Sequence, residues 1–348
     1  MSATLRIDSQ RFAQGRTPAM PVTSHDVARL AGVSQPTVSR ALRQDSQVSP
    51  ATRQRVRAAA EQLGYVPSER GRSLSTRSTR QIAMVADLDN PLYPQLVGPL
   101  HDAFAARGFR MVLLAERGEE IVGDDRLLDG SVDGAVLTTS QLRSSLPLQL
   151  HKHGLPFVQL NRVSELVDAD SVTADNAAGG RAVAELLAAG GHRQVAAILG
   201  PLETSTAGER ERGFRAGLRS AGLSLPAARV VRGWFSYEVG RDGMRTLLGW
   251  PNRPSAVFCI NDIVAVGALN ALAEMGLTVP QDISVVGFDD LDIASWPIFR
   301  LTSVRVEFEA MARRSAELLL SRIGQPDAPV VHELFPIELI ARATHRQI

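Results

Sequence analysis

The hydrophobic pattern of the chain begins with two short helical repeats, in TSHDVARLAGVSQPTVSRAL at residues 23–42. Small and aliphatic side chains fall where two short helices would meet, at Val27, Ala28, Ala31, Val33, Val38 and Leu42. Gly32 stands between the two halves, where a sharp turn favours a residue without a side chain. Ser34 can cap the second helix, and Pro36 is tolerated in the first turn because an N–H there has no intrahelical partner. The pattern predicts a helix-turn-helix.

A third helix is predicted in SPATRQRVRAAAEQLGY, at residues 49–65. It opens with a capping Ser49 followed by Pro50, and Gly64 suits its end. Val56, Ala60 and Leu63 lie at helical spacing, so this helix would close a small bundle over the first two. The polar residues before the bundle predict a mobile tail, and the Ser- and Arg-rich stretch after it predicts a linker.

From Gln81 onward, short apolar runs typical of strands alternate with longer runs at helical spacing. The strand candidates are IAMVADL, MVLLA, GAVLT, PFVQL, QVAAILG, VVRGWF, AVFCI and ISVVGF. The helical candidates include AAGGRAVAELLAAGG, RERGFRAGLRSAG, VAVGALNALAEMG and EAMARRSAELLLSRIG. This alternation predicts parallel sheets covered by helices, arranged either as one large sheet or as two similar lobes.

Polar and aromatic residues follow these predicted strands repeatedly. They are Asp87–Asn90 with Tyr93, Thr139–Ser140, Asn161–Arg162, Thr204–Thr206, Phe235, Asn261–Asp262 and Asp289–Asp290. Any single one of them is more often a helix cap or a loop residue. However, ligands of such sheets bind outside the carboxyl ends of the strands, where these residues would gather. The repetition predicts a pocket for a polyhydroxylated or otherwise polar small molecule.

The formal net charge of +1 conceals a strong asymmetry. Residues 1–80 hold 13 Arg and five acidic residues, a net charge of +8, which leaves 25 basic and 32 acidic residues and a net charge of −7 for the rest. A basic head on an acidic body is typical of a nucleic-acid-binding module joined to another domain. The second predicted helix, with its polar Gln35 and basic Arg40, is therefore expected to lie in a DNA major groove. The alternative is an amphipathic helix pair that only packs.

Several functional classes lack their signals in this chain. It has no glycine-rich phosphate loop and no nucleophile elbow, and His151 and His153 have no partners at metal-ligand spacing. Cys259 is the only cysteine and lies in an apolar run, so we expect an inert thiol and a reducing compartment. No segment has the pattern of a signal peptide or a membrane span. The sequence predicts a cytoplasmic protein, associated with the nucleoid, that is not an enzyme and has no cofactor, metal or membrane partner.

Several motifs occur together in the order and at the spacing of one family. They are the stretch at residues 23–42, SxxTRQRVxxAxxxLGYVP, VDGAVL, DNAAGG, GHRQVAAILGP, RPSAVFCINDIVAVGAL and VPQDISVVGFDD. In them the chain resembles, from about Val22 to about Arg342, the lac-repressor/purine-repressor (LacI/GalR) family of bacterial transcriptional regulators. The resemblance implies an all-α helix-turn-helix head, a hinge helix and a two-lobed α/β core of the periplasmic-binding-protein type, with two parallel sheets flanked by helices.

The implied partners are a second copy of the chain, a pseudo-palindromic operator in double-stranded DNA and a small polar effector such as a sugar, polyol or sugar acid. The expected parts are a tail at 1–20, a head at 21–66, a hinge at 67–80, a core at 81–348, an N-lobe at about 81–173 and 303–326, and a C-lobe at about 174–302 and 327–345. No leucine heptads follow the last predicted core strand, which favours a dimer over a tetramer. The rival interpretation is a periplasmic-type solute-binding protein without regulatory DNA binding.

The resemblance also assigns roles to single residues. The expected DNA contacts are Ser34, Gln35, Pro36, Thr37, Ser39, Arg40 and the wedge residue Leu74. Gln35 can offer its amide to adenine and Arg40 can pair with guanine, whereas Pro36 has no side-chain donor. The expected effector contacts are Tyr93, Ser140, Asn161, Arg162, Thr206, Arg210, Phe235, Asn261 and Asp289. For Arg162 the alternative is a salt bridge between the lobes.

Overall fold

The computed structural model of the protein describes residues 22–42, 46–65, 78–116 and 125–346. The chain divides into two compact units, with the boundary between Arg77 and Ser78. Within the described ranges, no helix is both long and apolar enough to cross a bilayer. The predicted hinge, including Leu74, falls almost wholly outside the described residues.

The first unit is the predicted three-helix head, built from α1 (Ser24–Ala31), α2 (Gln35–Leu42) and α3 (Pro50–Leu63). Thr23 and Asp26 form a capping box at the start of α1, and Ser49 accepts a hydrogen bond from the Thr52 N–H at the start of α3. Gly32 ends α1 with φ near +63°, a conformation that glycine adopts without steric cost. The helices share one small core, formed by Val27, Ala28, Ala31, Val38, Ala41, Val48, Val56, Ala59 and Ala60.

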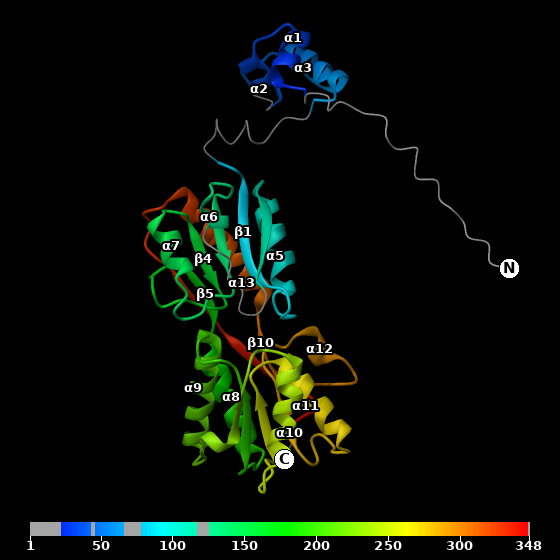
Figure 1. The fold of residues 1–348 in the computed structure, drawn as a ribbon, viewed down its shortest axis with the longest axis vertical. Helices are drawn as coiled ribbons and strands as arrows, with labels where there is room; N and C mark the ends of the chain where they lie inside the picture. The colour runs from blue at the N-terminus through cyan, green and yellow to red at the C-terminus, as the bar shows by residue number, and fades with distance from the viewer. Residues whose placement is uncertain (1–21, 43–45, 66–77, 117–124, 347–348) are drawn as a thin grey trace, which may run out of the picture. The chain divides into compact units, whose positions relative to one another are not determined.

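The second unit contains two separate parallel sheets (Figure 1), which decides between the two predicted arrangements in favour of two lobes. The strands of the first sheet, in spatial order, are β11 (His332–Phe335), β5 (Ser171–Ala174), β4 (Phe157–Leu160), β3 (Gly134–Leu137), β1 (Gln81–Asp87) and β2 (Arg110–Glu116). The helices of this lobe are α5 (Pro94–Ala105), α6 (Asp125–Leu128), α7 (Leu146–Lys152) and α13 (Phe308–Gly324).

The second sheet has the order β7 (Val230–Arg232), β6 (Val195–Leu199), β8 (Ala256–Cys259) and β9 (Ser284–Val286). In Figure 1, α8 (Asn176–Ala189) and α9 (Ser205–Ser220) cover one face, and α10 (Tyr237–Leu248) and α11 (Asp262–Glu274) cover the other. Two short helical segments complete the lobe, η1 (Ala227–Arg229) and α12 (Asp292–Ser295).

Glycines allow α8 and α9 to pack closely. A Cβ atom on Gly213 of α9 would overlap the carbonyl oxygen of Ala177 in α8, and one on Gly180 would overlap the carbonyl oxygen of Arg210. The backbones of the two helices therefore approach to a distance that no larger residue permits. This contact fixes the position of α9, which carries two of the predicted effector residues, Thr206 and Arg210.

The lobe boundaries differ from those predicted for the end of the chain. Residues 332–335 were expected in the C-lobe, but β11 pairs in parallel with β5 and extends the first sheet. Residues 303–306 were expected in the N-lobe, but β10 (Ser303–Val306) pairs antiparallel with β12 (Ile337–Ile340) in a ribbon of its own. These strands are short and lie at sheet edges, so their local pattern does not reveal which sheet they join.

Candidate functional site

The two lobes bring the predicted effector residues together at the carboxyl ends of their strands. Tyr93 follows β1, Ser140 follows β3, Asn161 and Arg162 follow β4, Phe235 follows β7, and Asp289 follows β9. Thr206 and Arg210 lie on α9, and Asn261 caps α11. All nine side chains are more than nine-tenths buried. Buried polar groups need partners, so the arrangement is suited to binding a polar molecule.

Arg210 and Asp289 form a buried ion pair at the centre of this group. Arg210 Nη2 donates to Asp289 Oδ1 over 2.7 Å, while Nε donates to Asn176 Oδ1 and Nη1 to the Ile260 carbonyl, each over 2.9 Å. Burial raises the pKa of Asp289, and the Arg210 charge opposes that shift. Asp289 has φ near +102°, a region that L residues rarely adopt. Such strain is typical of functional sites that the surrounding structure holds in place.

The guanidinium of Arg162 packs against one aromatic ring from each lobe. Its guanidinium carbon lies 4.5 Å from the ring centre of Phe235 and 5.9 Å from that of Tyr93. Among the described residues no ion pair to Arg162 is found, so the alternative of a salt bridge between the lobes receives no support. Arg162 Nε and the Tyr93 hydroxyl are buried without a hydrogen-bond partner in that part of the chain. Both atoms are therefore available to a ligand that carries hydroxyl groups.

Asn261 has a structural task as well as a predicted functional one. Its Oδ1 accepts the Val264 N–H over 3.0 Å and caps α11. The neighbouring Asp262 is fully buried, and its two oxygens accept hydrogen bonds from Ser303 Oγ and the Leu291 N–H. Substitution of Asn261 would therefore affect the start of α11 together with any ligand contact.

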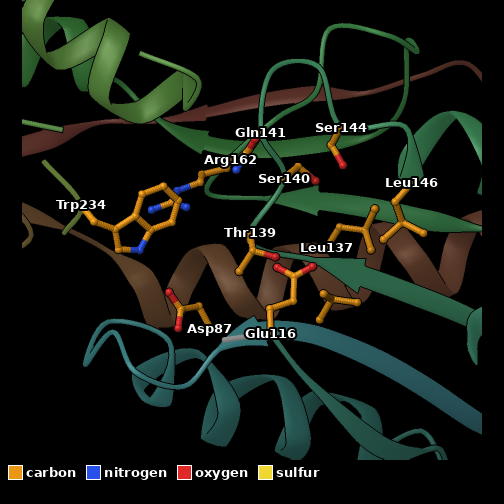
Figure 2. Close-up of a pocket in the computed structure, with 11 residues that line it drawn as sticks. Asp87, Glu116, Leu137, Thr139, Ser140, Gln141, Ser144, Leu146, Arg162 and Trp234 are labelled. Carbon is orange, nitrogen blue, oxygen red and sulfur yellow. The ribbon is translucent and has the colours of Figure 1, made fainter. Parts of the chain in front are cut away.

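An open hollow adjoins the buried group, and Figure 2 shows its lining. Trp234 and Arg162 lie on one side, Leu137 and Leu146 on the other, and Asp87 and Glu116 close it below. Burial raises the pKa of Asp87. The lining combines two carboxylates and one guanidinium with polar and apolar groups.

Several residues of this hollow have no role predicted from the sequence. They are Glu116, Gln141, Ser144 and Trp234, together with Asp87, which is predicted only to lie at a strand end. Two local signals were present. Glu116 is the last residue of β2, at the same edge of the sheet, and Trp234 precedes the assigned Phe235.

In the head, α2 carries the predicted DNA-contacting residues. Ser34, Pro36 and Arg40 are exposed, while Gln35, Thr37 and Ser39 are half-buried. The hydroxyls of Ser34 and Thr37 are hydrogen-bonded over 2.8 Å, and Gln35 Nε2 donates to Ser24 Oγ over 3.3 Å. The Gln35 amide is therefore positioned by α1 while the other end of the exposed face, at Arg40, stays open to solvent. Leu74, the predicted wedge, lies outside the described residues.

Comparison with known proteins decides the family. Residues 23–68 match the family model described as bacterial regulatory proteins, lacI family, and residues 184–345 match a periplasmic binding protein-like domain. The ribose operon repressor of Escherichia coli strain K12 is 36% identical, over 87% of this chain and 94% of its own length. The chain belongs to the LacI family. It is a DNA-binding transcriptional regulator, and neither an enzyme nor a solute-binding protein without regulatory DNA binding.

Two further LacI-family proteins extend the comparison. The HTH-type transcriptional regulator CelR of Thermobifida fusca is 37% identical, over 87% of this chain and 93% of its own length. The lac repressor dimer bound to operator superposes with a TM-score of 0.82 at 30% identity, over 93% of this chain and 99% of that one. The fold class predicted from the sequence, a helical head with a two-lobed α/β core, is confirmed.

Proposed function

We propose that the protein is a repressor that binds a pseudo-palindromic operator as a homodimer and responds to a small, neutral, polyhydroxylated effector. The observation that carries the proposal is the joining of two features in one chain. One is a basic helix-turn-helix head with an exposed polar face on α2, and the other is a two-lobed core with a largely buried polar pocket. The regulator acts in the cytoplasm, at the nucleoid, where its operator lies.

The charges of the pocket favour a neutral ligand. Asp87 and Glu116 line the hollow, and among the described residues of the lining Arg162 is the only cation. The second nearby cation, Arg210, already has Asp289 as its counter-ion. Carboxylates bind neighbouring hydroxyls of a sugar well and repel an acidic ligand. Trp234 and Phe235 supply flat apolar faces for a sugar ring. Of the sugars, polyols and sugar acids expected from the sequence, the first two therefore suit the site best.

The relatives support this class of effector. One related protein is a ribose operon repressor, and another, CelR, forms a complex with cellobiose. Ribose and cellobiose are neutral sugars, so both are suitable first probes for the present protein.

Two copies of the head are needed to read a site with two-fold symmetry. The core of one copy exposes large apolar side chains near α12, with Trp296 52% and Ile298 81% exposed. Exposed apolar groups of this size are typical of protein–protein contacts. We assign this surface to the contact between the two cores of the homodimer.

In the operator complex, Gln35 and Arg40 would contact base edges, and Ser34, Thr37 and Ser39 would contact phosphates. Pro36 can make only apolar contact with a base because it has no side-chain donor. Leu74 is assigned the wedge between central base pairs, which kinks the duplex. Sequence preference then depends chiefly on Gln35 and Arg40.

Replacement Arg40→Ala should relax base preference at one symmetric pair of positions, at a cost of about 1–3 kcal/mol in binding to the preferred site. The measurement is gel-shift titration on a set of duplexes that differ at single base pairs. Ser39→Ala provides the comparison, because loss of a phosphate contact weakens binding to all duplexes alike. Equal weakening across the set by Arg40→Ala would assign Arg40 to the phosphates.

The proposed function is tested by selecting duplexes from a random-sequence library with the full chain and footprinting the selected sites. We expect protection with two-fold symmetry.

A thermal-shift screen then compares ribose, cellobiose and other neutral sugars with gluconate and nucleobases, because a specific ligand raises the melting temperature by mass action. Asymmetric protection would contradict the dimeric operator, and stabilisation by gluconate alone would contradict the neutral effector.

A further inference from the structure

Asp133 holds the first described residues of the core by four hydrogen bonds. Its Oδ1 accepts from the Thr79 N–H over 2.6 Å and from Thr79 Oγ1 over 2.8 Å. Its Oδ2 accepts from Ser78 Oγ over 2.5 Å and from the Arg80 N–H over 3.0 Å. Three consecutive residues are thus fixed by one carboxylate, at the point where the chain enters the core from the head.

Further contacts hold the same segment against the core. The Asp133 N–H donates to the Gln81 carbonyl, and the Arg110 N–H donates to the Arg80 carbonyl, each over 2.8 Å. Arg80 has φ near +55°, and its guanidinium lies 5.0 Å from the ring centre of Phe109. Burial alone would raise the pKa of Asp133, but the hydrogen bonds from Ser78, Thr79 and Arg80 lower it overall. The surroundings of Asp133 therefore favour its charged carboxylate. Arg80, whose N–H donates to that carboxylate, is held in a strained backbone conformation.

Two buried strands connect this attachment to the effector pocket. β1 begins at Gln81, directly after the bound residues, and ends at Asp87 in the pocket lining. β3 begins at Gly134, directly after Asp133, and leads to Thr139 and Ser140 in the same lining. The strands pair in parallel from Ile82 opposite Gly134 to Val85 opposite Leu137. This strand pair therefore runs from the residues that Asp133 binds to the lining of the pocket.

We propose that Asp133 is a positioning residue that fixes where the linker to the DNA-binding head leaves the core, so that β1 and β3 transmit changes at the pocket to the head. This inference rests on the proposed function in one respect, that the pocket binds the effector. The carboxylate acts through residues 78–80 and contacts neither DNA nor effector itself.

The test compares three full-length variants with the wild-type chain. Asp133→Ala removes all four hydrogen bonds, and Asp133→Asn retains one carbonyl acceptor. Asp129→Ala is the matched control, because Asp129 Oδ1 accepts the Ser131 N–H within the same loop, over 2.8 Å, and no hydrogen bond between Asp129 and residues 78–80 is found in the described part of the chain. Each variant is titrated with the duplex selected by the wild type and with a scrambled duplex, in the absence of sugar and with ribose or cellobiose.

Without sugar, we expect Asp133→Ala to lower the ratio of specific to non-specific affinity about tenfold, within the range typical of coupling between sites. Asp133→Asn should fall between Asp133→Ala and the wild type, and Asp129→Ala should match the wild type. The sugar that stabilises the wild type should bind Asp133→Ala with unchanged affinity but alter its operator affinity much less. A merely structural role for Asp133 would instead weaken sugar binding and leave the coupling unchanged.

A wild-type affinity ratio in Asp133→Ala would overturn the inference. If Asp133→Ala does not fold, the double variant Ser78→Ala with Thr79→Val removes the two side-chain donors and is read in the same way. Failure of the wild type to select any duplex would contradict the proposed function itself. Selection of a duplex with no effect of either sugar would contradict the effector class and leave the sugar-free comparison to decide the role of Asp133.

Discussion

Replacing Asp289 by alanine is expected to lower the free energy of unfolding of the core by about 3–5 kcal/mol, because it leaves a buried charge without its partner. Arg210 and Asp289 are each about 4% exposed at the side chain, so water cannot replace the lost carboxylate. The effector response should disappear with it. The three tryptophans, Trp234, Trp250 and Trp296, all lie in the core, so their fluorescence during urea unfolding reports this unit alone.

Two other substitutions at the same position separate charge from backbone strain. Asp289→Gly also removes the carboxylate but adopts φ near +102° without a steric penalty. It should be at least as stable as Asp289→Ala, although glycine ordinarily costs roughly 0.5–1 kcal/mol relative to alanine. Asp289→Asn keeps an oxygen acceptor for Arg210 and should lie closest to the wild type. A wild-type unfolding curve for Asp289→Ala would show that the ion pair does not stabilise the core.

The second large effect is expected from Gly213→Ala in α9. The added methyl group would overlap the carbonyl oxygen of Ala177, so α8 and α9 must move apart. Overpacking of this kind typically costs about 1–3 kcal/mol, and here it would also displace Thr206 and Arg210 from the pocket. Loss of sugar-induced thermal stabilisation, measured with the same sugar that stabilises the wild type, is the functional readout.

Gly208→Ala is the matched control, because it lies in the same helix, and apart from its own helical turn no described atom lies within 4 Å of the added methyl group. Alanine is favoured over glycine in a helix by about 1 kcal/mol, so this variant should be slightly more stable than the wild type. The two substitutions thus have opposite expected signs. Equal effects would mean that the close approach of α8 and α9 does not constrain the lobe.

The alternation of strand and helix was predictable because each element has its own hydrophobic period. The gathering of strand-end residues was predictable for a related reason, since parallel strands place their carboxyl ends at one edge. Which strands become neighbours depends on pairings between distant segments. His332–Phe335 joins Ser171–Ala174 in one sheet, and nothing in either short run identifies the other.

The details of the pocket depend on the same long-range pairings. Glu116 lines the hollow because β2 lies beside β1, and Trp234 does so because the second lobe faces the first. The sequence identifies Arg162 as a candidate but does not distinguish an ion pair from stacking on Phe235 and Tyr93. In the head, the three helices follow from caps and spacing, whereas the contact of Gln35 with Ser24 depends on how α1 and α2 meet.

The pairing of β11 with β5 also affects the order in which the parts of the protein fold during synthesis. Domains tend to fold as their residues leave the ribosome, and the small core of the head is complete once Tyr65 has emerged. The first sheet, by contrast, lacks an edge strand until residues 332–335 are synthesised, and the Val285 N–H of the second sheet finds its partner only at Thr344. A nascent chain therefore carries a folded DNA-binding head well before either lobe is complete. Interrupted synthesis would release a head whose binding to DNA no effector can control.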